Sequence, residues 1–274
     1  MPEILNFAHF MNKSWFVLFF LIILVSCSSY NKVYKSKDPE YKLRMAEQYF
    51  ANKKYNVAQQ LYEDLFTYFK GDARYEDMIY KYAYCFYNQG DYLSAENYFK
   101  NFLEIFPKSI KAEEMDYMRC YSYFKQSPKP DLDQSNTIKA IGAMQTFIAN
   151  HQGSLRIADA NKVIDECRAK LEIKAFKGAT LYFNMGQYKA AAISFSNLIN
   201  DYPDSPKGDQ YKLMVLRSYY EYALLSVEEK QRERYEQVVT EYNDFADRYP
   251  DSKLFKEAER YYNLSQNNLK ALSK

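Results

Sequence analysis

Residues 92–109 read YLSAENYFKNFLEIFPKS, and the order of residues in this stretch decides the fold. The small residue Ala95 is followed four positions on by Phe99, eleven on by Phe106 with a proline directly after it, and fourteen on by Ser109. Spacings of four and seven place apolar side chains on one helix face. Proline ends a helix, and serine favours the start of the next one. The stretch therefore predicts a helix, a turn and the beginning of a second helix.

The same pattern recurs five times along the chain. The small position holds Ala58, Ala95, Ala140, Ala191 and Val238, and the capping position holds Asp72, Ser109, Ser154, Ser205 and Ser252. A first helix with a small residue and an aromatic three positions on, such as Ala83 and Phe86, precedes the second helix. This pattern of residues at fixed spacings is typical of a tetratricopeptide (TPR) array. We therefore expect an all-α fold, a TPR solenoid of five helix pairs plus a C-terminal capping helix.

The offsets place the array over residues 39–272. The expected pairs lie at about 39–70, 73–107, 110–151, 155–203 and 206–250, and the capping helix at 253–272. Residues 155–185 contain no proline, which predicts a single long helix there. Ser226 to Glu229 has the form of a capping box that opens the last second helix. Stacked repeats of this kind form one continuous body.

Composition agrees with a helical array. The 274 residues include 29 Tyr and 19 Phe but only 7 Gly and 8 Pro, which leaves little turn material for an all-β fold. Tyrosine suits the space between stacked helices, because its ring can be buried while its hydroxyl reaches a polar partner.

The N-terminus predicts export and lipidation. Residues 1–26 have the layout of a signal peptide, with an apolar run of 11 residues from Trp15 to Val25 that is too short for a membrane span of about 20 residues. Leu-Val-Ser-Cys at 24–27 is similar to a bacterial lipobox, so Cys27 is the predicted lipidated N-terminus. An ordinary secretory signal with an incidental cysteine is the alternative, and translation could start at Met1 or Met11. Residues 27–38 are polar and are expected to form a flexible tether, at whose end Asp38 caps the first helix.

The sequence offers little catalytic or metal-binding chemistry. The mature chain has one histidine, His151, at a position where the other repeats mostly carry aromatic residues. Cys85, Cys120 and Cys167 lie on separate expected helices, and a disulfide between two of them stays open in an oxidising compartment. We expect no metal site, no cofactor and no enzymatic activity. The formal charge of +2 is spread along the chain, which argues against nucleic-acid binding.

The first helices of an array line its groove, and two of them are rich in aromatics. The TPR register places six aromatic residues on this wall, namely Tyr80, Tyr84, Tyr87, Tyr117, Tyr121 and Phe124. Glu40, Asp77 and Glu114 recur every 37 residues beside them. We interpret the six aromatics as a peptide-binding surface. The alternative is that the rings only pack between helices and that the acids complement helix N-termini.

The combination of a lipobox, a short tether, five TPRs and the repeat junctions Tyr-Pro-Asp-Ser at 202–205 and 249–252 resembles the BamD lipoprotein family. The resemblance implies an outer-membrane lipoprotein that is lipid-anchored at Cys27 and faces the periplasm. It also implies that the N-terminal repeats bind unfolded outer-membrane protein precursors, and that the C-terminal repeats dock on a BamA-like barrel subunit. The partners would then be these two proteins and the membrane, with no nucleic acid.

Two other classes of protein share parts of this pattern. One is a periplasmic TPR scaffold lipoprotein for cell-wall or division enzymes. The other is a glycan-binding lipoprotein of the SusD type, which could stack sugars on tyrosines.

Overall fold

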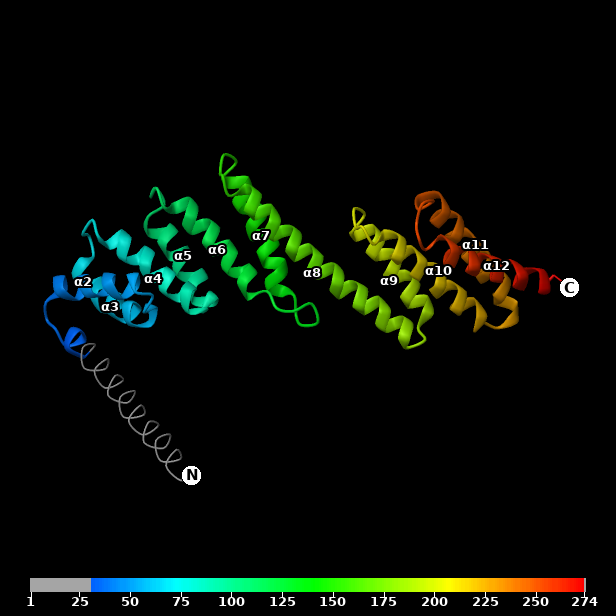
Figure 1. Cartoon of the computed structure of the whole chain (residues 1–274), viewed down its shortest axis with the longest axis horizontal. Coiled ribbons are helices and arrows are strands. Elements are labelled where there is room, and N and C mark those ends of the chain that lie inside the picture. The colour runs from blue at the N-terminus through cyan, green and yellow to red at the C-terminus, as the bar shows by residue number, and fades with distance from the viewer. Residues whose placement is uncertain (1–30, 274) are drawn as a thin grey trace, which may run out of the picture. The chain divides into compact units, whose positions relative to one another are not determined.

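The computed structural model describes residues 31–273, and this part of the chain is helical with no strand (Figure 1). Residues 31–34 are helical and precede the labelled helices. The helices are α2 (Pro39–Ala51), α3 (Tyr55–Phe69), α4 (Tyr75–Gln89), α5 (Tyr92–Ile105), α6 (Ala112–Gln126), α7 (Ser135–Asn150), α8 (Ile157–Asn184), α9 (Tyr188–Asp201), α10 (Gly208–Leu224), α11 (Glu228–Arg248) and α12 (Phe255–Ala271). The all-α fold of helix pairs is therefore confirmed, and α8 is the long helix expected within 155–185.

The described residues form two compact units. The first contains residues 31–127 and 135–164, and the second contains residues 128–134 and 165–273. The repeat pattern predicts one continuous body, so this division differs from the expectation. Repeat offsets cannot reveal it, because α8 carries the chain from the first unit into the second without a break in the helix.

The small residue of each second helix lies at the contact between paired helices. Ala58, Ala95, Ala140, Ala191 and Val238 all have no exposed surface. Four residues on, Tyr62, Phe99 and Phe195 are equally buried. Helices such as α2 and α3, or α4 and α5, can pack closely at these positions (Figure 1), because a small side chain leaves room for the large one a turn away.

The predicted capping residues accept hydrogen bonds as expected, but three residues before the regular helix begins. The Asp72 carboxylate accepts from the backbone N–H of Arg74 at 2.8 Å. The hydroxyls of Ser109, Ser154, Ser205 and Ser252 likewise accept from the N–H two residues on, at 3.0–3.2 Å. Each carbonyl also accepts from the N–H three residues on, so a single turn precedes the helix.

The capping serines also link successive repeats. Each hydroxyl donates to an acid on the preceding first helix, in the pairs Ser109–Glu76, Ser154–Glu113, Ser205–Glu172 and Ser252–Asp209, at 2.5–2.6 Å. A serine can do both because its oxygen accepts one bond while its proton serves another.

One local expectation is wrong. The capping box at Ser226 does not form, because the N-cap of α11 is Val227 and makes no side-chain cap bond. The Ser226 hydroxyl instead donates to the Tyr222 carbonyl at 2.5 Å and accepts from Arg234. In the described part of the expected tether, residues 31–34 are helical and Val33 is only 2% exposed within the first hydrophobic cluster. Asp38 does cap α2, as predicted, by accepting from two backbone N–H groups.

The three described cysteines, Cys85, Cys120 and Cys167, are buried and free, so no disulfide joins them. Burial raises the pKa of each thiol, to about 12 for the first two and about 11 for the third. These side chains act as small apolar groups.

Candidate functional site: an aromatic surface on α4 and α6

All six aromatic residues predicted to line the groove belong to the first unit. Tyr80, Tyr84 and Tyr87 lie on α4, and Tyr117, Tyr121 and Phe124 lie on α6. Within each helix the spacing of four and then three residues places the rings on one face. We call this set of six residues the aromatic surface. Five of its members are partly exposed, and Tyr117 is 7% exposed.

Three of the six residues form the base of the aromatic surface. The Tyr84 hydroxyl donates to a Glu114 carboxylate oxygen at 2.6 Å, and the Tyr80 hydroxyl reaches the same oxygen at 3.3 Å. These bonds connect α4 to α6. Tyr117 packs edge-on against Phe147, with ring centroids 5.5 Å apart.

Ionisation of the base is suppressed. Burial, with the negative charge of Glu114 close by, raises the pKa of Tyr80 and Tyr84 above the ordinary value. Burial also raises the pKa of Tyr117 to about 12. The hydroxyls of the base therefore stay protonated donors at neutral pH.

The other three residues form the outer part of the aromatic surface. Tyr121 stacks on Tyr117 with ring centroids 5.8 Å apart and an interplanar angle of 14°. Phe124 continues the row, 5.4 Å from Tyr121. Burial raises the pKa of Tyr87 to about 12, with smaller contributions from the neighbouring Tyr121 and Tyr92. All three outer residues are partly exposed, so their rings offer accessible apolar faces.

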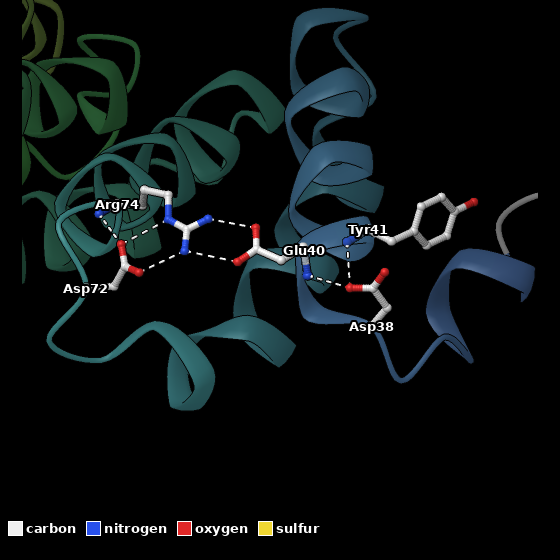
Figure 2. A network of polar contacts seen from close by, with 5 residues as sticks. All are labelled: Asp38, Glu40, Tyr41, Asp72 and Arg74. Atoms are coloured by element: carbon white, nitrogen blue, oxygen red, sulfur yellow. Dashed lines mark hydrogen bonds and ion pairs between the residues drawn. The ribbon is translucent and has the colours of Figure 1, made fainter.

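The acids expected beside these aromatics are engaged by cations of the following repeat. Arg74 binds Glu40 through two parallel bonds of 2.7 and 3.1 Å, and Asp72 holds the same guanidinium from the other side (Figure 2). Lys111 binds Asp77 at 2.8 Å. These two acids therefore form contacts between repeats. For them, the alternative interpretation of a structural role holds.

Glu114 also pairs with a cation of the following repeat, but at a longer distance, since its carboxylate lies 3.9 Å from the Arg156 guanidinium. Each of the three cations also lies over a ring, in the pairs Arg74–Phe69, Lys111–Tyr80 and Arg156–Tyr117, at 4.5–5.1 Å from the centroid. We call these three acid–cation–ring sets the ladder. The sequence signal for it was present but missed, since each cation stands two residues after a capping residue.

The ladder influences which ligand side chains the aromatic surface can bind. Its carboxylates are neutralised by the protein's own cations, so they offer little net charge to a ligand. The rings that remain accessible favour apolar and aromatic side chains, through area burial and ring–ring contacts of about 0.5–1.5 kcal/mol each.

The second unit lacks the ladder. Ile173 and Gln210 occupy the positions that hold acids in the first unit. A pocket of about 530 Å³ lies there between α10 and α12, and its lining includes Leu213, Met214 and Leu254. Lys207 and Lys253 stand at its edge, together with Asp209, Gln210, Pro206 and Glu257.

The remaining predicted positions are placed as follows. His151 packs on Phe147 with ring centroids 4.7 Å apart, and its Nε2 lies 3.0 Å from an Asp116 carboxylate oxygen, so it is a packing residue with a polar partner. Cys27 lies outside the described residues. Within residues 31–273 no three His, Cys, Asp or Glu side chains are grouped to hold a metal ion. In the same range, none of the helices has the length and apolarity needed to cross a membrane.

Comparisons with known proteins place the chain in a family. The putative outer membrane protein assembly factor BamD of Aquifex aeolicus (strain VF5) is 28% identical over 150 residues, which are 54% of this chain and 47% of that protein. The alignment thus spans about half the length of this relative.

Two solved structures are similar at lower identity. One is a TPR2AB-domain:pHSP90 complex of yeast Sti1, with a TM-score of 0.38 at 13% identity over 83% of this chain and 98% of that one. The other is a putative kinesin light chain with TPR-like repeats from Podospora anserina, with a TM-score of 0.32 at 14% identity over 78% and 96%. The YfiO family model, described as outer membrane lipoprotein, matches residues 36–235. That match covers most of the array, and the chain belongs to the YfiO family of outer membrane lipoproteins.

Proposed function

We propose that this chain is a lipoprotein of the outer-membrane protein assembly machinery, anchored by lipid on Cys27 and facing the periplasm. Membership of an outer membrane lipoprotein family and similarity to a protein named as a putative assembly factor support this proposal. Its task would be to bind unfolded β-barrel precursors at the aromatic surface and to present them to a BamA-like barrel subunit.

The observation that carries the proposal is the aromatic surface itself. Two tyrosines of α4 are tied to α6 through Glu114, which holds the base of the surface in place before any ligand arrives. A pre-organised surface loses less entropy on binding. The ligand that fits is an extended peptide ending in an aromatic residue, with its ring against Tyr121 and its neighbours.

Docking of the barrel subunit is assigned to the second unit. Its pocket between α10 and α12 is lined by apolar side chains together with two lysines and two acids, which suits an apolar residue of a partner flanked by polar side chains. The pocket depends on α12, whose Ala258 and Tyr261 are buried against α10 and α11. The final helix would therefore both close the unit and complete the docking site.

Depletion of the protein in its own bacterium tests the proposal. We expect outer-membrane β-barrel proteins to disappear from the membrane before cell shape or division changes. The scaffold alternative predicts the opposite order, with barrel proteins intact and cell-wall synthesis disturbed.

A binding experiment separates the proposal from the glycan-binding alternative. The purified protein should bind a peptide taken from the C-terminal strand of a barrel protein, and lose it when the terminal aromatic residue is changed to alanine. Binding of oligosaccharides in place of the peptide would contradict the proposal.

A further inference from the structure

The segment before α2 is attached to the first helix pair. Val33 is 2% exposed and belongs to the same buried cluster as Leu43 of α2 and Leu61 of α3. The Lys42 ammonium lies 5.7 Å from the centroid of the Tyr34 ring. Residues 31–37, which the sequence marks as tether, therefore move with α2 and α3.

This attachment brings the predicted lipid close to the folded protein. Val33 is only six positions after Cys27 in the sequence. An extended chain covers at most about 3.3–3.6 Å per residue, so the two α-carbons lie within roughly 20 Å of each other. A lipid on Cys27 would therefore hold the first helix pair at the bilayer surface.

The attached segment is strongly basic. Lys32, Lys35 and Lys37 are all exposed, and no acid stands between residues 31 and 37. Among the ion pairs within the described part of the chain, none involves any of these three lysines.

Acids close by are engaged elsewhere. Asp38 accepts from two N–H groups at the start of α2, and Glu40 is bound by Arg74 (Figure 2). Asp64 is paired with Lys42. None of these acids forms an ion pair with the three lysines, so the segment keeps an exposed excess of positive charge.

We propose that residues 31–37 form a membrane-contact segment, in which Lys32, Lys35 and Lys37 bind the anionic headgroups of phospholipids while Val33 ties the segment to α2 and α3. This inference rests on the proposed lipid at Cys27. Anchoring commonly combines acyl chains with basic residues. Each lysine near an anionic surface strengthens attachment about fivefold. The function of the segment is then to fix the first helix pair at the membrane.

The test uses the mature lipidated chain inserted into vesicles of phosphatidylethanolamine, with or without phosphatidylglycerol. A fluorophore is attached to a cysteine introduced at exposed Gln48 of α2, or at exposed Asn97 of α5 as the distant control, and headgroup-labelled lipid serves as quencher. We expect stronger quenching at position 48 than at position 97. The excess should grow when phosphatidylglycerol is present.

Two variants distinguish the effect of the lysine charges from the effect of Val33 packing on α2 and α3. Lys32→Gln/Lys35→Gln/Lys37→Gln should remove the dependence on phosphatidylglycerol and leave the melting temperature unchanged. Val33→Asn should lower the quenching at position 48 in both lipid mixtures. A matched control neutralises three other exposed lysines of the first unit, Lys108, Lys139 and Lys162, and should behave as the unmodified protein.

The outcomes are distinct. Equal quenching at both positions, or a triple variant that keeps its dependence on phosphatidylglycerol, would overturn the membrane-contact segment while the lipid anchor stands. Mass spectrometry of the same preparation that finds no lipid on Cys27 would overturn both the segment and the proposed anchor.

Discussion

The division of the aromatic surface into a base and an outer part predicts that two substitutions of similar cost to stability differ in their effect on binding. Tyr84→Phe removes one hydroxyl and leaves the ring. That hydroxyl donates to the Glu114 carboxylate at 2.6 Å. A hydrogen bond to a charged group contributes about 1.5–3 kcal/mol. The Tyr80 hydroxyl remains on the same oxygen, so we expect a loss near the lower end, about 1–2 kcal/mol.

Tyr121→Ala removes a ring from the outer part. Its contacts are the stack on Tyr117 and the tilted contact with Phe124, which contribute about 0.5–1.5 kcal/mol each. Stability should therefore fall by a similar amount. If a ligand ring rests on Tyr121, binding should also weaken roughly tenfold, since about 1.4 kcal/mol corresponds to a factor of ten.

The assay measures both quantities on each variant. Thermal unfolding followed by circular dichroism gives stability, and fluorescence anisotropy of a labelled peptide with a terminal aromatic residue gives affinity. We expect Tyr84→Phe to lower the melting temperature by about 3–8 °C with affinity per folded molecule unchanged. Tyr182→Ala, which truncates an exposed tyrosine of the second unit, is the control and should keep full affinity. Unchanged affinity in Tyr121→Ala would refute the reasoning and leave the rings with a packing role alone.

Three further predictions concern other parts of the chain. Cys27→Ala should yield a form that no longer fractionates with the outer membrane, and an intact signal on the unmodified protein in mass spectrometry would contradict the lipobox. Deleting residues 253–274 should destabilise the second unit, because it uncovers the apolar faces of α10 and α11, and should abolish co-purification of the barrel subunit; recovery of that partner in full would argue against docking there. Burial raises the pKa of Asp77, but hydrogen bonds from Lys111 and Lys81 outweigh it and hold the pKa below the ordinary 3.8. A carboxyl with a lowered folded-state pKa stabilises the protein above the unfolded-state value and loses that effect as the pH falls. Urea unfolding should therefore show Asp77→Asn destabilised at pH 6 and closer to the unmodified protein near pH 3.

The sequence predicted the helix pairs because the fold requires particular residue sizes at fixed offsets. Ala58 and Tyr62 are both fully buried, and this combination of a small and a large residue four positions apart is visible in the letters alone. The long helix α8 was predictable because residues 155–185 contain no proline and only one glycine, so the two strongest helix-breaking residue types are nearly absent there.

Features that depend on a single contact were not predictable. Val33 is one apolar residue in a polar segment, so no periodic pattern marks it, yet its burial fixes residues 31–37 to the first helix pair. Ser226 matched a capping box, but the Tyr222 carbonyl and the Arg234 guanidinium take its hydroxyl. Neither the packing of Val33 nor the hydrogen bonds of Ser226 follow a periodic pattern that the sequence alone would reveal.

The column of acids shows why the position of a charge does not reveal its role. Glu40 and Asp77 recur at the groove position and look like ligand contacts in the sequence. In the structure the cations of the next repeat bind them, and those cations cover rings at the same time. These ion pairs hold successive repeats together. The outer rings are then the groups of the aromatic surface that stay accessible to a ligand. Where Gln210 stands at the acid position in the second unit, no such pair can form there. The pocket beside it is lined by apolar side chains together with two lysines and two acids, so it would recognise a different partner.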